Sequence, residues 1–471
     1  MLRKHLWAAI LSSVTLSPMA FAANWVEAVA QHPSVQIQYS AIAQQRWKTL
    51  ELEAKQGFDF NITSSGHLTL VENYDSNFSR ASKQDPYLDM VFSASKTIYD
   101  FGQNQALINA QKALRDKAAL NFATSFEDQT HKLFSLIVQY QKAQRTKDVI
   151  NATRAEIDLV LKTLASRFEA GLGTMTDIRR TQLKQIDFET QAVHLQYKIN
   201  EVEHVVKSEY GIPLVQLEQT WQTIKAHLVL PASINQNNLR SNAMSDDEQY
   251  ALRQQRSSIA AQKKPHLALD INATMFDVTR NLKNYRMAGE LRLTFPAFDS
   301  GYRSARMTTL THAITAEQQS LDQLIQQKTL ALKANQRLLE ETQLHRQQNT
   351  KQLSNLQVQL GNMKHALGQT SNDYAGLTSL YTQIASHQIA LVHIDSRIDQ
   401  LMLDSLLLSE QIIHQFKVAI NQLLWVSHTT NLPRTIGFSG RYCAVNAFIY
   451  KWYWPQFSST FLPSLARFTL W

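Results

Sequence analysis

The residue types that could carry out chemistry in this chain are histidine, aspartate and glutamate, and they form no catalytic pattern. The 15 histidines are scattered along the sequence. His194 and His204 lie ten residues apart, and His131, His227 and His266 stand alone. The sequence contains no H-E-x-x-H, no G-x-S-x-G and no phosphate-binding Walker loop. We therefore predict that the protein is not an enzyme and binds no cofactor.

Cysteine chemistry is excluded in the same way, because Cys443 is the only cysteine. One thiol cannot form a disulfide framework, nor a zinc or iron–sulfur site that needs a cysteine cluster. Cys443 also lies far from the start of the chain, which argues against an N-terminal lipid anchor on cysteine. No metal site is therefore expected.

The formal net charge of +8 could suggest a nucleic-acid partner, but its distribution does not. Arg3 and Lys4 carry two of these charges. Residues 429–471 carry four more, without any Asp or Glu, at Arg434, Arg441, Lys451 and Arg467. Residues 23–428 are left with about +2 and are nearly neutral. We predict no nucleic-acid partner.

The first 22 residues have the pattern of a secretory signal peptide. Arg3 and Lys4 precede an apolar run from Leu6 to Leu16, and "AFA" at 20–22 supplies the small residues of a cleavage site. The run is about half of the roughly 20 residues that a membrane anchor needs. We therefore expect export, with a mature chain that starts at Ala23.

Two long stretches lack the residues that break helices. No proline lies in 87–212 or 297–432, and no glycine lies in 103–170 or 302–360. Breakers this sparse predict two very long helices, over 103–170 and 302–367. Unbroken, the first would span 68 residues, or roughly 100 Å at about 1.5 Å per residue. An ordinary globular domain has no use for such a helix.

Apolar residues in and after these stretches follow the spacing of three and four residues that is typical of coiled coils. The spacing occurs at Leu353, Leu356, Leu360, Met363 and Leu367, at Leu391, Ile394, Ile398, Leu401, Leu408 and Ile412 with Ser405 as a polar lapse, and at Ile150, Ile157, Leu164 and Leu161, Phe168. A helix lying on a compact core would show a wider apolar stripe. We therefore predict coiled-coil seams.

Four segments upstream of the long helices alternate apolar and polar residues, which predicts half-buried strands. The segments are residues 57–64, 87–99, 266–274 and 287–297. Their polar faces include Asp59, Asn61, Asp89, Asp270, Glu290 and Arg292. Four strands cannot close a barrel, whereas two copies would give eight strands with a filled interior and three copies twelve with a lumen. A polar inner face and an apolar outer face suit a wet pore in lipid. A soluble sandwich would explain the alternation, but not the signal peptide and the long helices.

The two halves of the chain repeat one plan, consisting of a short helix, two strands, a long helix, a tight turn and a return helix. The first repeat spans 23–215, a linker or equatorial region 216–240, and the second repeat 241–428. Gly171 and Gly368 at the turns lie 197 residues apart, and the junction glycines Gly102 and Gly301 lie 199 residues apart. These nearly equal offsets indicate an internal duplication.

An aromatic residue, an aspartate and a glycine occur together at each strand–helix junction. The residues are Tyr99, Asp100 and Gly102 in "YDFG", and Phe298, Asp299 and Gly301 in "FDSG". A glycine supplies the backbone freedom that a sharp change of direction needs. The aspartate can accept hydrogen bonds from the first free N–H groups of the helix.

The duplicated plan, these junctions and the turns "AGLGT" and "LGQTS" resemble the TolC family of outer-membrane channels over residues 24–428. The resemblance implies an α+β membrane protein, a homotrimer in outer-membrane lipid. Each chain would contribute four β-strands to a twelve-stranded transmembrane barrel, and the long helices would continue this barrel as a coiled-coil periplasmic tunnel. The tips of the helical hairpins would contact an adaptor protein and form the constriction.

The resemblance assigns tip residues in both repeats. They are Arg167, Gly171, Leu172, Thr174 and Asp177 at the first tip (171–175), and Gly368, Thr370, Ser371, Asp373 and Tyr374 at the second (368–372). Where the family often has an acidic pore residue, this chain has Tyr374, with Asp373 one position earlier. A rotation of about 100° per residue could aim Asp373 elsewhere, and a solvated surface acid is the other interpretation.

The implied function is passive conduction in the outer membrane and periplasm. The chain would be the exit duct for an inner-membrane ABC or RND-type transporter that it reaches through a periplasmic adaptor (membrane fusion) protein, in type I protein secretion or small-molecule efflux. The alternative is that the chain is itself such an adaptor with a coiled-coil hairpin. The channel is favoured because the chain has two hairpins and only four strand candidates.

Residues 429–471 do not fit either repeat. They hold 11 of the 43 aromatic residues and show no helix or strand period. Trp, Tyr and Lys favour membrane interfaces, so the tail could be an interfacial patch. A frameshifted or otherwise aberrant end that does not fold with the rest explains it equally well. We predict that this tail is disordered.

Overall fold

The computed structural model describes residues 23–67, 87–234, 239–276, 278, 284–367, 373–416 and 418. The expected signal peptide (1–22), the second tip (368–372) and the aromatic tail (429–471) lie outside these residues. The chain divides after Leu423 into two units, and every described residue belongs to the first.

The helices and strands follow the duplicated plan. The first half contains α1 (Ala23–Gln31), α2 (Pro33–Ala54), β1 (Asp59–His67), β2 (Tyr87–Tyr99), α3 (Gln103–Glu169) and α4 (Met175–Tyr210). The second half contains α6 (Arg240–Ala261), β3 (His266–Met275), β4 (Tyr285–Thr294), α7 (Tyr302–Leu367), α8 (Tyr374–Leu408) and α9 (Ile412–Gln415). Between them lies α5 (Leu214–Lys225), which covers the first part of the expected linker.

The segment after Pro213 is therefore more than a linker. Pro213 occupies the N-cap of α5, a helix start where proline is tolerated because no backbone N–H is needed there. Trp221 of α5 is fully buried and packs against Phe134 of α3, with 5.6 Å between ring centroids. Phe134 also meets Trp25 of α1 at 5.4 Å and Phe416 after α9 at 5.0 Å. This aromatic core joins the two repeats near the middle of α3.

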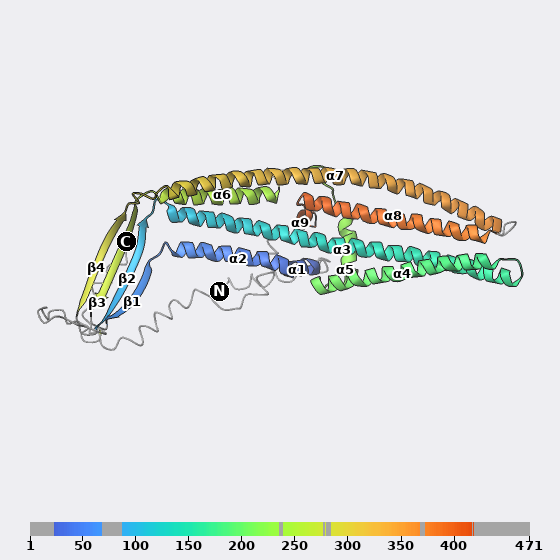
Figure 1. Cartoon of the computed structure of the whole chain (residues 1–471), viewed down its shortest axis with the longest axis horizontal. Helices are drawn as coiled ribbons and strands as arrows, with labels where there is room; N and C mark the ends of the chain where they lie inside the picture. Colours follow the sequence, from blue (N-terminus) through green and yellow to red (C-terminus); the bar gives the residue numbers. More distant parts are fainter. Residues whose placement is uncertain are drawn as a thin grey trace, which may run out of the picture. The chain divides into compact units, whose positions relative to one another are not determined.

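α3 is the central helix of the described chain (Figure 1). It packs against α2, α6, α4 and α8, whereas α7 packs against α6 and α8. Burial follows this arrangement. The inward side of α3 is buried along most of its length, whereas Leu332 is the only buried residue of α7. Among the described residues, no helix combines the length and the hydropathy that a membrane crossing requires.

Parts of the predicted coiled-coil seams lie at these helix contacts, whereas Phe168 of the predicted seam is exposed. Ile150 and Ile157 of α3 pack with Phe188 of α4 and Ala385 of α8. Nearer the tips, a second core cluster joins all four helices of the two hairpins, with Leu164 of α3 among its buried members. Leu360, Met363 and Leu367 of α7 pack against this second cluster. The fold is thus α+β, with long helical hairpins and one small sheet.

The four strands form one antiparallel sheet in the order β1-β2-β3-β4. The register places apolar residues opposite one another, as in Ile62↔Phe92 and Leu269↔Leu291. Polar residues are paired on the other face, as in Asp270↔Glu290. A bulge between Thr97 and Tyr99 returns Tyr99 to the apolar face, opposite Leu267. The sheet therefore has the two contrasting faces that the alternation predicts.

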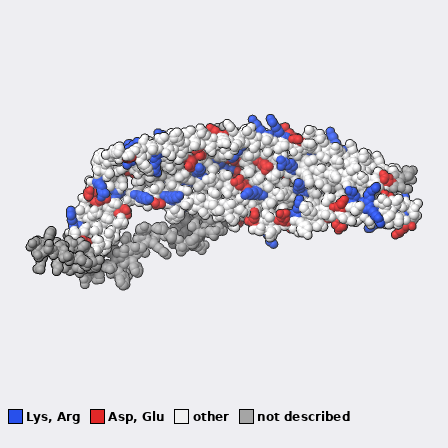
Figure 2. Space-filling view, in the orientation of Figure 1, with Lys and Arg blue, Asp and Glu red and all other residues white. Residues whose placement is uncertain are grey.

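Charged side chains are spread along the helices. On the face shown in Figure 2, basic and acidic residues are interspersed, and no large area carries a single sign. This distribution matches the nearly neutral charge of residues 23–428.

Candidate functional site

The strand–helix junctions are built identically in the two repeats. Asp100 accepts hydrogen bonds from the backbone N–H groups of Gly102 (3.0 Å) and Asn104 (2.8 Å). Asp299 accepts them from Gly301 (3.1 Å) and Arg303 (3.1 Å). Each aspartate thus satisfies two free N–H groups at the start of a helix of more than 60 residues. The backbone N–H of Arg303 is the largest influence on Asp299 and lowers the pKa of its carboxyl group.

The junction glycines adopt the conformation for which glycine is needed. Gly102 has φ +81° and Gly301 φ +83°, both in the left-handed region. The residues before them, Phe101 (φ 54°) and Ser300 (φ 51°), are also left-handed, although each carries a side chain. Two consecutive left-handed residues turn the chain from the sheet into the long helix.

The two aromatic residues of the junction motifs lie at the surface. Tyr99 packs edge-on against Phe101, with 4.6 Å between ring centroids. Phe298 is almost fully exposed. Neither residue belongs to the buried core.

The first tip is held by local hydrogen bonds. Gly171 has φ +71°, and the N–H of Leu172 donates to the carbonyl oxygen of Arg167 (2.8 Å). Thr174 is the N-cap of α4 and accepts a hydrogen bond from the N–H of Asp177 (3.2 Å). The Thr174 hydroxyl donates in turn to the Asp177 carboxylate (2.6 Å). The bond from the Asp177 N–H is the first half of a capping box, but the Asp177 carboxylate accepts from the Thr174 hydroxyl and not from its backbone N–H. Leu172 is left exposed at the end of the hairpin.

At the second tip, Gly368, Thr370 and Ser371 lie outside the described residues. Asp373 is the N-cap of α8 and accepts a hydrogen bond from the N–H of Gly376 (2.7 Å). Asp373, one residue before Tyr374, therefore caps the start of α8.

Tyr374 connects the two tips. The guanidinium carbon of Arg167 lies 5.3 Å from the centroid of the Tyr374 ring, a cation–π contact between the end of α3 and the start of α8. Tyr374 is half-buried and packs against the core cluster of the four hairpin helices. An aromatic residue at this position thus holds the hairpins together, which a carboxylate could not do through packing.

Three further residues, which no sequence pattern singles out, connect the hairpins. The Tyr381 hydroxyl of α8 donates a hydrogen bond to the Glu156 carboxylate of α3. Lys364 of α7 lies 3.6 Å from the same carboxylate and 5.2 Å from the centroid of the Tyr381 ring. We call Glu156, Lys364 and Tyr381 the tip latch. No sequence signal pairs residues this far apart, so only the tertiary structure reveals it.

The charge states of the tip latch favour its hydrogen bonds. Burial, and then the hydrogen bond to Glu156, raise the pKa of Tyr381. The contacts with Tyr381 and Glu156 raise the pKa of Lys364. Near neutral pH the Tyr381 phenol therefore keeps its proton and donates a hydrogen bond to the Glu156 carboxylate. The Lys364 ammonium group stays charged beside both partners.

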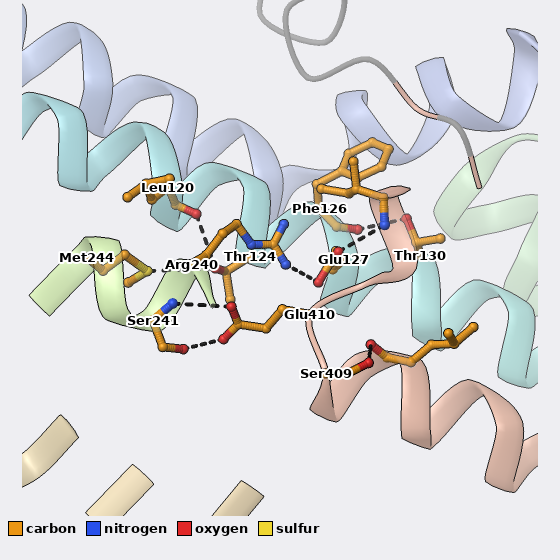
Figure 3. Close-up of polar contacts among 12 residues, drawn as sticks. Leu120, Thr124, Phe126, Glu127, Thr130, Arg240, Ser241, Met244, Ser409 and Glu410 are labelled. Atoms are coloured by element: carbon orange, nitrogen blue, oxygen red, sulfur yellow. Dashed lines mark hydrogen bonds and ion pairs between the residues drawn. The ribbon is translucent and has the colours of Figure 1, made fainter. Parts of the chain in front are cut away.

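A buried polar network joins the two repeats farther from the tips (Figure 3). Glu127 of α3 forms an ion pair with Arg240 of α6 and accepts a hydrogen bond from the N–H of Ile413 (2.9 Å). Glu410 accepts hydrogen bonds from the N–H of Ser241 (3.2 Å), from the Ser241 hydroxyl and from Lys328 of α7.

The pKa shifts of the two carboxylates differ in direction. Burial raises the pKa of Glu127 despite its contact with Arg240. Burial also tends to raise the pKa of Glu410, but the hydrogen bonds from Lys328 and Ser241 outweigh this effect, and the pKa is lowered. We call Glu127, Arg240, Ser241, Lys328 and Glu410 the equatorial network. It ties α3, α6 and α7 to the turn after α8.

Within the described part of the chain, no group of three or more His, Cys, Asp or Glu residues is placed to hold a metal ion. The site that the structure does assemble consists of helix caps, hairpin contacts and two contrasting sheet faces.

Comparison with known proteins gives a clear result for the fold. No protein-family profile matches the sequence, and no curated protein matches it significantly. Among solved structures, CusC, described as forming a transmembrane channel, has a TM-score of 0.71 and 11% identity, with 83% of this chain and 91% of CusC covered.

Two further solved structures give similar values. The outer-membrane protein VceC of Vibrio cholerae has a TM-score of 0.68 and 14% identity, covering 84% of this chain and 96% of VceC. The outer-membrane channel CmeC of Campylobacter jejuni has a TM-score of 0.69 and 10% identity, covering 84% and 89%. The resemblance seen in the sequence is thus confirmed at the level of the fold, and the chain has the fold of the TolC-family outer-membrane channels.

Proposed function

We propose that this chain is the outer-membrane exit channel of a tripartite export system and acts as a homotrimer. It would conduct substrate passively from an inner-membrane ABC or RND-type transporter and a periplasmic adaptor to the outside. Several solved structures with this fold, among them OprN, CmeC and MtrE, are described as outer-membrane channels, and VceC as an outer-membrane protein, which supports the proposal. The observation that carries the proposal is that the sheet of one chain has two unpaired edges, at β1 and β4.

The sheet is incomplete in one chain. β1 and β4 are its edge strands, and each has a neighbour on one side only. Long unpaired edges are liabilities that proteins cover or close. If β1 of one copy paired with β4 of the next, every edge would be satisfied in a closed ring. Three copies of a four-stranded sheet would give twelve strands and a lumen.

The helices have matching open edges. α7, which follows β4, exposes Leu330 (68%) and Val358 (64%). α2, which precedes β1, exposes Trp47 (67%), and α4 exposes Leu183 (63%) and Tyr197 (70%). Burying these side chains against a neighbouring copy is favourable by about 25 cal/mol per Å². The edge of α7 and the edge of α2 and α4 are therefore suited to meet each other in a ring.

The two faces of the sheet suit lipid and water. The apolar face exposes Phe60 (74%), Met287 (73%) and Leu291 (66%). On the polar face, Arg292 lies 2.8 Å from Asp270 and 4.0 Å from Glu290 and offsets the repulsion between these two opposed carboxylates. A barrel with the apolar face outward would present these charged groups to a water-filled passage.

Opening would occur at the hairpin tips. The tip latch and the contact between Arg167 and Tyr374 join the first hairpin to the second with few polar contacts. Sliding α7 and α8 against α3 and α4 would break these contacts while the apolar seams reform in a second register. An adaptor that binds the tips can shift the equilibrium between closed and open tips only by binding the open arrangement more tightly than the closed one.

Purification of the mature chain from outer membranes tests the proposal. We expect extraction to require detergent, native mass spectrometry to give a trimer, and planar bilayers to show discrete conductance steps. A monomer that remains in buffer without surfactant would contradict the channel. Copurification with a transporter and an adaptor, identified by mass spectrometry, would distinguish protein secretion from small-molecule efflux.

A further inference from the structure

We propose that two lysines in an aromatic belt at the helix-proximal end of the sheet bind the phosphate groups of anionic phospholipids. The inference rests on the proposed function, because it requires the apolar face of the sheet to meet lipid. It adds a lipid-headgroup site, with its ligand class and its residues, to that surface.

The belt consists of exposed aromatic side chains at the end of the sheet where the helices begin. Its members are Phe58, Phe60, Tyr99, Phe101, Phe295 and Phe298, with exposures between 40% and 87%. They come from the start of β1, the junction of β2 with α3 and the junction of β4 with α7. Aromatic rings gathered at one end of a sheet are typical of the boundary between hydrocarbon and headgroups.

The first lysine lies on the apolar face itself. Lys96 of β2 is opposite Leu269 in the register, on the same face as Phe92 and Ala94. Its ammonium group lies 4.9 Å from the centroid of the Phe58 ring. A charge on a lipid-facing surface is costly in hydrocarbon, but a long side chain can reach the headgroup layer.

The second lysine has the same arrangement at the neighbouring junction. The ammonium group of Lys264 lies 5.1 Å from the centroid of the Phe101 ring. Each ring covers one side of the ammonium group and leaves other N–H donors free to bind an acceptor. Among the residues that the structure describes, neither lysine forms an ion pair with a carboxylate.

The aspartates of the two junctions are engaged by backbone N–H groups, and those of β1 and β3 lie on the other face of the sheet. Asp100 and Asp299 accept hydrogen bonds from the helix N-termini. Asp59 and Asp270 belong to the polar face of the sheet. The ammonium groups of Lys96 and Lys264 therefore lie beside exposed apolar surface without a carboxylate paired directly to either of them among the described residues.

This combination fits one chemical class, a phospholipid whose headgroup carries a net negative charge. The ammonium groups of Lys96 and Lys264 complement the phosphate, and the adjoining apolar face, including Phe60 and Ile62, can contact the acyl chains. A free phosphate ion would gain only the first of these contacts. Because the belt lies at the end of the sheet nearest the helices, the lipids would belong to the leaflet on that side.

The experiment measures lipid retention by the intact trimer in detergent. Native mass spectrometry would follow phosphatidylglycerol and phosphatidylcholine added in equal amounts to the wild-type chain, the Lys96→Gln/Lys264→Gln variant and the Lys96→Arg/Lys264→Arg variant. The matched control is Lys162→Gln/Lys351→Gln, which removes two exposed charges from the helices α3 and α7. A parallel sample contains inorganic phosphate as competitor.

We expect the wild type to retain phosphatidylglycerol in preference to phosphatidylcholine. The double Gln variant should lose this preference by roughly fivefold per lysine. The Arg variant and the Lys162/Lys351 control should keep the preference, and inorganic phosphate should not compete with the lipid.

Three results would overturn the lipid site, namely equal retention of the two lipids by the wild type, an unchanged preference in the double Gln variant, or displacement by inorganic phosphate. The wild-type comparison does not depend on the folding of any variant. If a trimer conducts in bilayers but shows no lipid preference, this inference fails and the channel stands. If the wild type gives neither trimer nor conductance, the proposed function itself fails.

Discussion

The hydroxyl of Tyr381 on α8 donates a hydrogen bond to the carboxylate of Glu156 on α3, 225 residues earlier in the chain. Seven positions before Tyr381, Tyr374 also lies between the hairpins, but it contacts Arg167 through its ring rather than its hydroxyl. Two tyrosines on one helix thus join the hairpins by different interactions. They can be distinguished by removing a single oxygen atom from each.

Tyr381→Phe should favour opening of the tips. Losing a hydrogen bond to a charged acceptor costs about 1.5–3 kcal/mol, with the lower end expected at a half-buried site. The fraction of time that the channel spends open should then rise by about tenfold. Single-channel recording in planar bilayers would measure it.

Tyr374→Phe is the matched control, because it keeps the ring beside Arg167, and its hydroxyl makes no hydrogen bond with any described residue. We expect it to leave the open fraction close to that of the wild type. Equal effects of the two substitutions would contradict the role of the tip latch.

Alanine at Gly102 or Gly301 should destabilise the protein. Both residues have φ above +80°, and a Cβ atom would meet no atom within 4 Å, so the cost is backbone strain alone. We expect a loss of about 1–2 kcal/mol for each, detectable as a lower thermal unfolding midpoint. Gly361→Ala, in the exposed interior of α7, should instead raise stability by about 0.5–1 kcal/mol. An increase in stability in Gly102→Ala would contradict the left-handed conformation of Gly102.

Gly376→Ala should loosen the start of α8. A Cβ atom on residue 376 would collide with the carboxylate of Asp373, so the capping side chain would have to move away. Loss of the cap costs about 1 kcal/mol and should speed hydrogen exchange in the first turn of α8. Asp373→Asn keeps a capping oxygen and should exchange almost as the wild type does. Unchanged exchange in Gly376→Ala would contradict this cap.

Glu410→Gln should reduce both stability at neutral pH and sensitivity to acid. The pKa of Glu410 lies below its ordinary value of 4.5, so its contribution to stability is present above about pH 4.5 and is lost as the pH falls through the lower value in the folded protein. We expect Glu410→Gln to cost about 2–3 kcal/mol at pH 7, because Lys328 loses its charged partner.

The unfolding midpoints of wild type and Glu410→Gln should therefore converge between pH 5 and pH 3, about the range over which the carboxylate becomes protonated. The comparison isolates Glu410, because Glu127, whose pKa burial raises, is present in both proteins. Glu341→Gln, at an exposed position, should shift the midpoint little at any pH. A constant difference from pH 7 to pH 3 would rule out the charged Glu410.

The sequence alone determined the features that depend on neighbouring residues. Absence of proline and glycine predicted α3 and α7, alternation predicted the four strands, and the Asp-x-Gly spacing predicted the capped junctions at Asp100 and Asp299. Such signals arise from the geometry of a few adjacent residues, so they can be read without the rest of the chain.

The tertiary structure decided everything that depends on residues far apart in the chain. The contact of Glu156 with Tyr381 and that of Glu127 with the backbone N–H of Ile413 cross from one repeat to the other. α5 escaped prediction because its stability comes from burying Trp221 in the aromatic core rather than from its own pattern. The partner of a buried carboxylate or a buried ring is fixed only when the helices pack, because the entropy of closing such long loops is repaid by the assembled core and not by any local segment.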